Sequence, residues 1–337
     1  MNARTINTLS LIKVFGAGLV ITAHYSSVFY ERAFYSFGTG CFFVVAGYYA
    51  LTWERSRGIV YFAKRMIRLY PGYLAAVFAY LITTPSAWEE WPPLLLHHLA
   101  LLLTASRVET VYALNPAFWS LPVFVTFFAI IACLPRFTPT FRSVAMLAVL
   151  PFVVITLGGL EWRNGYLQLW AFPLYFYAFV LGGAIGHVMR HHAQKPSAGF
   201  TIAAVALAVA VVTAGAFYKP LGLDAPKLVT FLYEEIMTVL YGALLWCLLN
   251  SPLVDRKLPL ISFAGNISFG IYLFHNLPPH VFKPLLPPIP AIALSLVATM
   301  LLAWLSLIAI ERPIQRWLKP KLSNHSPARA QSGTQGQ

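Results

Sequence analysis

The sequence predicts an all-α fold: a polytopic membrane helix bundle with about ten transmembrane helices and both termini in the cytoplasm. Hydrophobic residues make up 58% of its 337 residues and charged residues only 10%, with a mean hydropathy of +0.68, whereas a soluble domain carries about 25% charged residues. Apolar runs long enough to cross a bilayer recur along the chain, and basic residues are shared unevenly between the segments that join them.

The apolar runs predict spans at residues 8–29, 36–53, 70–84, 118–134, 143–160, 166–188, 200–217, 228–250, 263–283 and 290–311. The third is predicted to begin at Pro71, because proline suits the first turn of a helix. Residues 94–104 are too short to cross comfortably, so we predict an interfacial or re-entrant segment, with an eleventh span as the alternative. We assign residues 1–320 to one transmembrane domain and the polar residues 321–337 to a disordered cytoplasmic tail.

The basic residues predict the orientation. With the N-terminus inside, 17 of the 24 Lys and Arg residues lie in inner segments and 6 in outer segments, while Lys13 lies within the first span. This asymmetry satisfies the positive-inside rule, and we expect a multi-pass protein of the inner (cytoplasmic) membrane. The net charge of +13 could also suit nucleic acid, but no soluble basic patch with interleaved aromatics is present. We therefore expect the lipid bilayer, and not nucleic acid, as a partner.

Two ionisable side chains in the first span mark a candidate site. Lys13 and His24 stand 11 positions apart, so they share a helix face, with about 16 Å between them along the helix axis. Ionisable groups at such depth usually face a bundle interior or a water-filled cavity. The alternative is that Lys13 extends to the lipid headgroups and His24 makes one structural hydrogen bond.

A pair of arginines marks the inner end of the third span. Arg65 and Arg68 stand three positions apart and therefore share a helix face. Each guanidinium can offer a two-pronged donor, which suits a phosphate-bearing ligand. The alternative is that this basic loop only fixes the orientation and contacts anionic headgroups.

Polar side chains also mark the eighth and ninth spans. Glu234 and Glu235 open the eighth on its outer side, where a carboxylate is costly unless it is paired or lies in the wet headgroup zone. In the ninth span Ser268, Tyr272 and His275 form one stripe, a pattern that interhelical hydrogen bonds also produce. His275, like the histidine of the first span, falls in the outer half, and a second deep histidine favours a proton-transfer site.

Other recurrent residues indicate no further site. The sequence has no metal-ligand spacing, no phosphate-binding glycine loop and no Ser-His-Asp order, so we expect neither a bound metal nor a bound cofactor. Gly182, Gly183 and Gly186 in the sixth span indicate close helix packing.

Several motifs, in chain order, resemble the membrane acyltransferase-3 family, which includes O-acetyltransferases acting on bacterial surface glycans. The matching residues are Lys13 and His24 of the first span, the glycine- and phenylalanine-rich segment 37–49, Arg65 and Arg68 before Tyr70 and Pro71, Trp119 to Leu121 around Ser120, the segment 265–275, and the closing Glu311, Arg312 and Pro313. Two positions depart from the pattern. Lys13 replaces the usual arginine, and Phe124 stands where many members have a glutamate, for which Glu234 or Glu235 is a candidate substitute.

The resemblance implies an O-acyltransferase, with acetyl as the expected group, that moves an acyl group from cytosolic acyl-CoA to a hydroxyl of a surface or exported glycan. It implies His24 as general base, His275 as a second catalytic residue, and Lys13, Arg65 and Arg68 as donor-binding residues. Acid or structural support is expected from Glu234, Glu235, Ser120, Tyr272 and Glu311. Acyl-CoA is then a co-substrate.

Two other functions remain open from the sequence. A transporter or flippase would also need ionisable residues inside the membrane, although no inverted repeat or matching pair of broken helices is visible. A sensor or accessory subunit of a glycan-assembly machine is the third reading, because Phe124 replaces a carboxylate.

Overall fold

The computed structural model describes residues 3–30, 34, 38–54, 58–83, 91–101, 110, 112–134, 138–158, 167–191, 195–219, 227–256 and 258–323. These residues form helices and no β-strand, which confirms the predicted all-α class. Of the predicted tail, residues 321–323 complete the last helix, and residues 324–337 lie outside the described part of the chain.

The α-helices are α1 (Ala3–Tyr30), α2 (Thr39–Tyr48), α3 (Gly58–Thr83), α4 (Trp91–Leu99), α6 (Ser120–Cys133), α7 (Phe141–Gly158), α9 (Leu167–His191), α10 (Ala198–Phe217), α11 (Lys227–Leu249), α12 (Pro259–Phe274), α13 (Leu277–Phe282), α14 (Pro288–Ser306) and α15 (Arg312–Ser323). Short helical segments of other types are η1 (Tyr49–Trp53) and η5 (Leu307–Glu311), which are π-helical, and η3 (Pro116–Trp119) and η4 (Pro252–Asp255), which are 3₁₀.

Six described segments are long and apolar enough to cross a membrane: Ala3–Tyr30, Gly58–Thr83, Pro116–Cys133, Ala198–Phe217, Leu232–Leu249 and Pro288–Leu318. Shorter apolar helices accompany them, at Thr39–Trp53, Phe141–Leu150 and Pro259–Phe274. The chain is therefore a multi-pass helical membrane protein. The count of ten spans and the cytoplasmic position of the termini stay predictions.

Two predicted boundaries are wrong. The third span does not begin at Pro71, because α3 starts at Gly58 and contains the proline in its interior. The basic segment is therefore part of the helix, and Arg65 within it is buried and paired with Glu54 instead of lying in a polar loop. The ninth span is not continuous either, since α12 ends at Phe274 and α13 follows as a separate short helix. The nine-residue α4 rises only about 14 Å, so it is too short to span, and its re-entrant placement stays a prediction.

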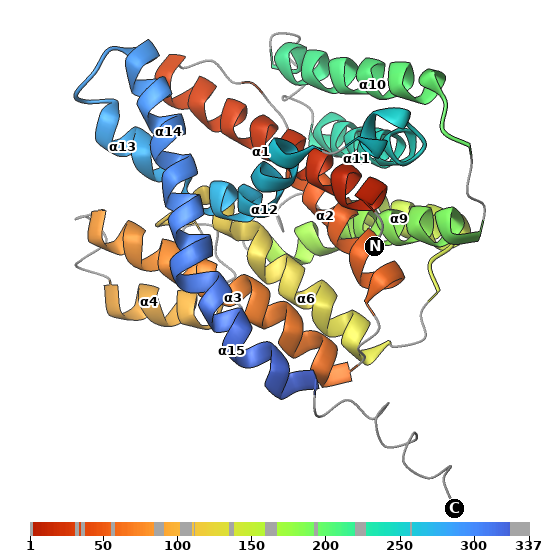
Figure 1. Ribbon diagram of the computed structural model, residues 1–337, viewed down its shortest axis with the longest axis horizontal. Helices are drawn as coiled ribbons and strands as arrows, with labels where there is room; N and C mark the ends of the chain where they lie inside the picture. The colour runs from red at the N-terminus through yellow and green to blue at the C-terminus, as the bar shows by residue number, and fades with distance from the viewer. Residues whose placement is uncertain are drawn as a thin grey trace, which may run out of the picture.

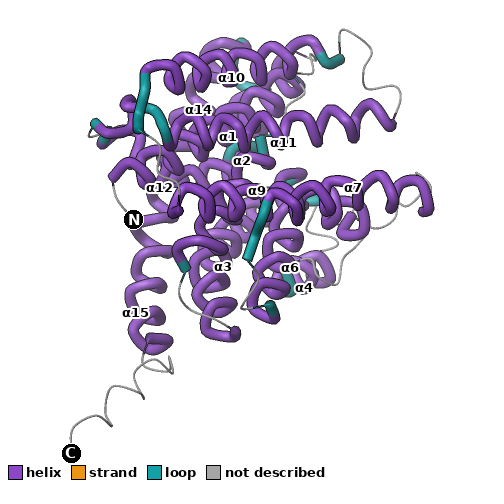
Figure 2. Tube along the Cα trace, turned by 90° about the vertical axis from the view of Figure 1, so that its right-hand side faces the viewer, coloured by secondary structure: helices purple, strands orange, loops and turns teal. Residues whose placement is uncertain are grey.

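The helices pack around α2, which contacts α1, α9 and α11. Figure 1 shows α14, η5 and α15 crossing the front of the molecule as one rod, with α3, α4 and α6 gathered below and α10 and α11 above. Figure 2 shows the same two groups from the side, with α7, α9 and α12 between them.

Small residues of α9 allow it to approach α2 and the η1 segment that follows α2. A Cβ on Gly182 would lie 1.9 Å from the carbonyl oxygen of Val44, and one on Gly186 would lie 2.1 Å from Oγ1 of Thr52. A Cβ on Gly183 would lie 2.5 Å from Leu51. Side chains larger than hydrogen do not fit these positions, which confirms that the three glycines serve close helix packing.

Candidate active site

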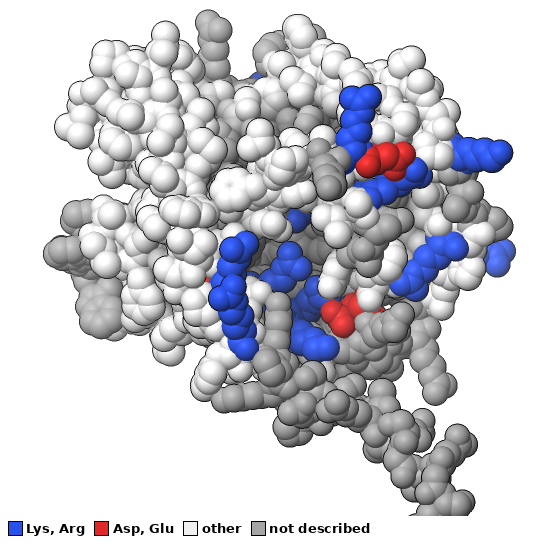
Figure 3. Space-filling view, viewed as in Figure 1, with Lys and Arg blue, Asp and Glu red and all other residues white. Residues whose placement is uncertain are grey.

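A cavity of about 440 Å³ lies where α1, α2, η1, α3, α6, α12, η5 and α15 meet. Its described lining includes four basic side chains and one carboxylate, which are Lys13, Arg65, Arg68, Arg312 and Glu311. In Figure 3, Lys and Arg side chains gather around a hollow, and they are scarce on the upper left part of the same face. The three residues predicted to bind a donor, which lie on two spans, thus share one cavity.

The cavity has a solvent-open mouth and a buried floor. Ile6, Arg68 and Arg312 are exposed members of its lining, whereas Ser268 and Tyr272 are buried. Aromatic and aliphatic side chains form most of the wall between these ends, namely Leu9, Phe42, Leu69, Leu121, Phe124, Phe128 and Phe269. An anionic head at the mouth and a thin, largely apolar arm reaching inward would match this lining.

Lys13 faces this cavity. Its Nζ donates a hydrogen bond of 2.6 Å to the backbone carbonyl oxygen of Gly265 on α12. The two helices are close at this point, because a Cβ on Gly265 would lie 2.5 Å from Cβ of Ser10. The ammonium group is therefore anchored between α1 and α12, and it does not extend along the lipid-facing surface to the headgroups.

The two predicted anion-binding arginines have different environments. Arg65 is buried, and its Nη2 donates a 2.5 Å hydrogen bond to Oε2 of Glu54. Its guanidinium carbon also lies 4.6 Å from the ring centroid of Tyr49 and 5.2 Å from that of Tyr61. Arg68 is exposed at the mouth, and the described residues give it no ion pair within 4 Å. Arg68 is thus the arginine that is open to a ligand.

The carboxylate partner of Arg65 is a feature that sequence reasoning missed. Glu54 directly follows η1, and this π-helical turn also carries the ring of Tyr49 that covers the guanidinium. A charged residue just outside an apolar run was the available signal, but it did not indicate which basic residue it would meet.

The cavity floor is a hydrogen-bonded junction between α12 and the start of α6. Tyr272 donates through its hydroxyl to the carbonyl oxygen of Ala117 at 2.6 Å, and the same hydroxyl lies 2.9 Å from Oγ of Ser120. Asn115 adds a 2.9 Å bond from Nδ2 to the carbonyl oxygen of Leu273. The structure therefore brings together Ser120 and Tyr272, which the sequence placed in different spans.

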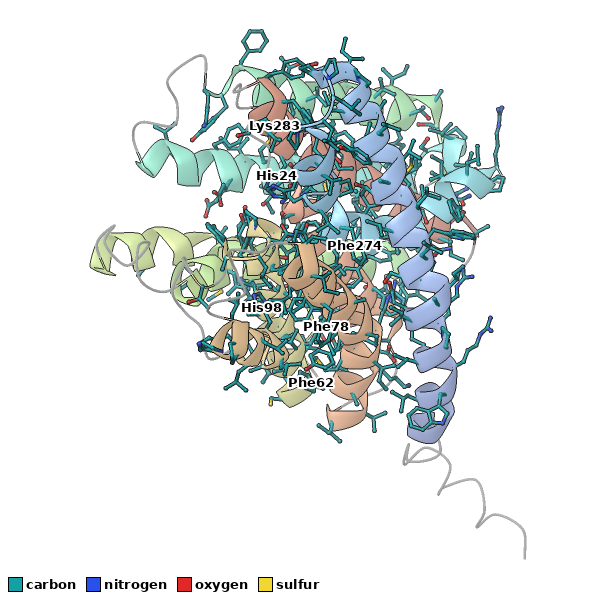
Figure 4. All side chains as sticks on the ribbon, turned by 90° about the vertical axis from the view of Figure 1, so that its left-hand side faces the viewer. His24, Phe62, Phe78, His98, Phe274 and Lys283 are labelled. Carbon is teal, nitrogen blue, oxygen red and sulfur yellow. The ribbon has the colours of Figure 1, made fainter. Side chains whose placement is uncertain are left out.

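His24 and His275 form a pair beyond this floor. Their ring centroids lie 4.8 Å apart, and the ring of His275 lies 6.1 Å from that of Tyr272. Figure 4 shows His24 between Lys283, near one end of the molecule, and Phe274, with Phe62 near the opposite end. The structure thus joins the deep histidines of two distant spans.

The tautomer of His275 follows from its contacts. Its Nδ1 lies 2.8 Å from the backbone carbonyl oxygen of Tyr272, and a carbonyl can only accept, so Nδ1 carries the hydrogen. In the neutral ring Nε2 then has a free lone pair, and within the described part of the chain this buried atom has no hydrogen-bond partner. The ring is fully buried, whereas His24 is only half-buried. His24 is therefore the member of the pair with more room for a ligand.

The predicted carboxylates separate into two places. Glu311 lines the cavity, is buried, and accepts a 3.2 Å hydrogen bond from Ser306. Glu234 and Glu235 lie on α11 and are not among the described lining residues. Glu234 is buried and accepts a 3.1 Å hydrogen bond from the hydroxyl of Tyr175, so it is not the solvated carboxylate.

Phe124 occupies the register in which the resemblance expects a glutamate. Its ring lines the cavity and stacks on Phe43, with 4.2 Å between the centroids. Phe43 stacks in turn on Tyr175 at 4.8 Å, and Tyr175 donates to Glu234. The rings of Phe43 and Tyr175 thus lie between Phe124 and the carboxylate of Glu234. The cavity wall is apolar at Phe124.

The described helices thus form a membrane bundle with a cavity lined by four basic side chains, and this cavity ends near the histidine pair of α1 and α12. The sequence model of a family described as an acyltransferase domain matches residues 6–309, so the chain belongs to the membrane acyltransferase-3 family. No curated protein and no solved structure matches the chain. The match covers the histidine pair and every predicted site residue except Glu311, and it ends before the cavity-lining residues Glu311, Arg312 and Gln315.

Proposed function

We propose that this membrane acyltransferase is an O-acetyltransferase that uses cytosolic acetyl-CoA and acylates a hydroxyl of a surface or exported glycan. The observation that carries the proposal is the continuity between the cationic cavity and the histidine pair through Tyr272. This tyrosine lines the cavity, and its ring lies 6.1 Å from that of His275.

In the proposed reaction, the oxygen of a glycan hydroxyl attacks the carbonyl carbon of the acyl thioester, and the carbon–sulfur bond breaks. His24 takes the proton of the hydroxyl as general base and returns it to the departing sulfur. The products are an O-acyl ester on the glycan and coenzyme A as the free thiol. The proposed role of His275, whose ring is fixed by its bond to the Tyr272 carbonyl, is to orient His24.

The donor would occupy the cavity with its phosphates at the mouth and its acyl arm directed inward. Lys13 and Arg68 are the proposed phosphate or carbonyl contacts, since both are basic residues of the cavity lining. Arg65 supports the site indirectly, because its own charge is already neutralised by Glu54. Along α1 the distance from Lys13 to His24 is about 16 Å, which the arm of the donor must bridge.

Mass analysis of the surface glycan from a deletion strain tests the proposal. Loss of an ester group from a polymer that is still made and exported is the expected result. Loss of the polymer itself would instead indicate transport of a glycan intermediate, and an unchanged ester content would overturn the proposal.

Cysteine labelling tests whether the cavity mouth faces the cytosol. In a variant without the three native cysteines, a membrane-impermeant maleimide added outside should label Lys219→Cys and leave Arg316→Cys untouched. Both positions are exposed, so access depends on the side of the membrane. The reverse pattern would contradict a cytosolic donor at this mouth.

A further inference from the structure

The last helix contributes to the cavity, although it lies beyond the last apolar run. Arg312 and Gln315 of α15 line the cavity together with Arg68. Arg312 is exposed at the mouth, and Gln315, three positions later on the same helix face, is half-buried. Helix α15 therefore forms part of the wall of the mouth, a role that sequence reasoning did not assign to Arg312 or Gln315.

The π-helical segment η5 sets the face that α15 presents. Helix α14 buries a stripe that includes Thr299, Ala303 and Ser306. A π turn contains one residue more than an α turn, so the residues after it are rotated by about 100° relative to an uninterrupted helix. After this shift Glu311 lies against α3, since a Cβ on Gly72 would be 2.9 Å from its Oε1. Arg312 follows next in the chain and lines the mouth.

The charges around the mouth are unbalanced. Arg65 is paired with Glu54, and the buried Glu311 lies beside Gly72, one helical turn after Arg68. Arg312 and Lys13 add two further positive charges to the described lining. Glu311 is the carboxylate of that described lining, and no second one balances these charges there. Such an excess favours a ligand with several negative charges over a single carboxylate.

We propose that Arg312 and Gln315 form the subsite for the phosphate-bearing nucleotide end of the acyl donor. This inference rests on the proposed use of an acyl-CoA donor. The guanidinium of Arg312 is suited to a two-pronged contact with a phosphate, and the amide of Gln315 can donate and accept beside it. The apolar wall deeper in the cavity then receives the neutral arm of the same molecule.

A lipid headgroup could offer the same phosphate chemistry, and α15 also carries exposed residues outside the described cavity lining. Trp317 is 64% exposed and Arg316 is also exposed, and neither is among the described lining residues. Arg316 is therefore a matched control: it has the same side chain as Arg312, lies one turn further along the same helix, and is outside the cavity.

The test is equilibrium binding of radiolabelled coenzyme A to the detergent-purified, full-length protein, with unlabelled adenosine 3′,5′-bisphosphate and pantetheine as competitors. Arg312→Ala should weaken binding of coenzyme A and of the bisphosphate by about 10- to 150-fold, as expected for loss of a charged hydrogen bond. The affinity of Arg312→Ala for pantetheine should change less than about two-fold. The affinities of Arg316→Ala for all three ligands should also change less than about two-fold. Arg312→Lys should retain part of the lost affinity.

Other results would overturn the subsite. Unchanged coenzyme A affinity in Arg312→Ala would remove Arg312 from the donor site, and an equal loss of pantetheine affinity would show general damage. If phosphatidylglycerol displaced coenzyme A from the parent but not from Arg312→Ala, the phosphate at this arginine would belong to a lipid. Failure of the parent itself to bind coenzyme A would contradict the proposed donor, whichever residue were changed.

Discussion

At the cavity mouth the candidate side chains are charged and in contact with solvent, whereas at the histidine end they are imidazole rings that lie deeper in the bundle. Arg68 and Arg312 are exposed and make no ion pair with the described residues. His275 is completely buried and is oriented by a backbone carbonyl. The mouth is thus suited to bind and release an anion, and the histidine end is suited to hold a base in one geometry. Changes at the two ends should therefore alter different kinetic parameters.

The largest expected effect is at the histidine end. His24→Ala should lower the acylation rate at saturating donor by about 10²- to 10⁴-fold, because a general base contributes that much to a rate. Coenzyme A binding and the amount of inserted protein should stay unchanged, since His24 does not line the described cavity. A loss of only two-fold would exclude His24 as the base.

His275→Ala is the comparison for this variant. It should retain measurable activity, because the proposed role of His275 is to orient its neighbour. If His275→Ala were inactive while His24→Ala acylated normally, the base would be on α12.

The second expected effect is on stability and concerns Arg65. Arg65→Ala should lower the free energy of unfolding by about 3 kcal/mol, because it removes the guanidinium that pairs with the largely buried carboxylate of Glu54. Thermal unfolding of the purified protein measures this loss. The double variant with Glu54→Ala should lose less than the sum of the two single variants. An Arg65→Ala protein as stable as the parent, with weakened donor binding, would return Arg65 to the donor site.

The third expected effect is at the mouth. Arg68→Ala should raise the KM for the acyl donor by about 10- to 150-fold with little change in kcat, since a charged contact to phosphate is lost. Lys64→Ala is the control, because it removes a positive charge from the same helix outside the described cavity lining. A lower kcat with unchanged KM would contradict the assignment of donor binding to the mouth and of the chemical step to the histidine end.

The smallest expected effect is at the floor between the ends. Tyr272→Phe removes the hydroxyl that donates to Ala117 and meets Ser120. One neutral hydrogen bond corresponds to about a 2- to 10-fold change in rate, and Ser120→Ala should cost less, because the bond to Ala117 remains. A complete loss of activity in Tyr272→Phe would give this hydroxyl a direct part in the chemistry.

The sequence by itself determined the fold class, the family resemblance and most of the candidate site. Apolar runs are local in the chain, so their length and composition predict membrane helices without knowledge of their neighbours. The 11-residue spacing of Lys13 and His24 is equally local, as are the other short motifs that carry the resemblance.

Tertiary structure decided which residues meet. No local pattern pairs Arg65 with Glu54 or leaves Arg68 open, because the difference depends on a π turn that follows α2. The pairing of His24 with His275 joins helices that are more than 200 positions apart, and the place of Arg312 in the cavity depends on the rotation introduced by η5. The physical reason is that a side chain's partner is fixed by helix packing and register, which the sequence of one span does not contain.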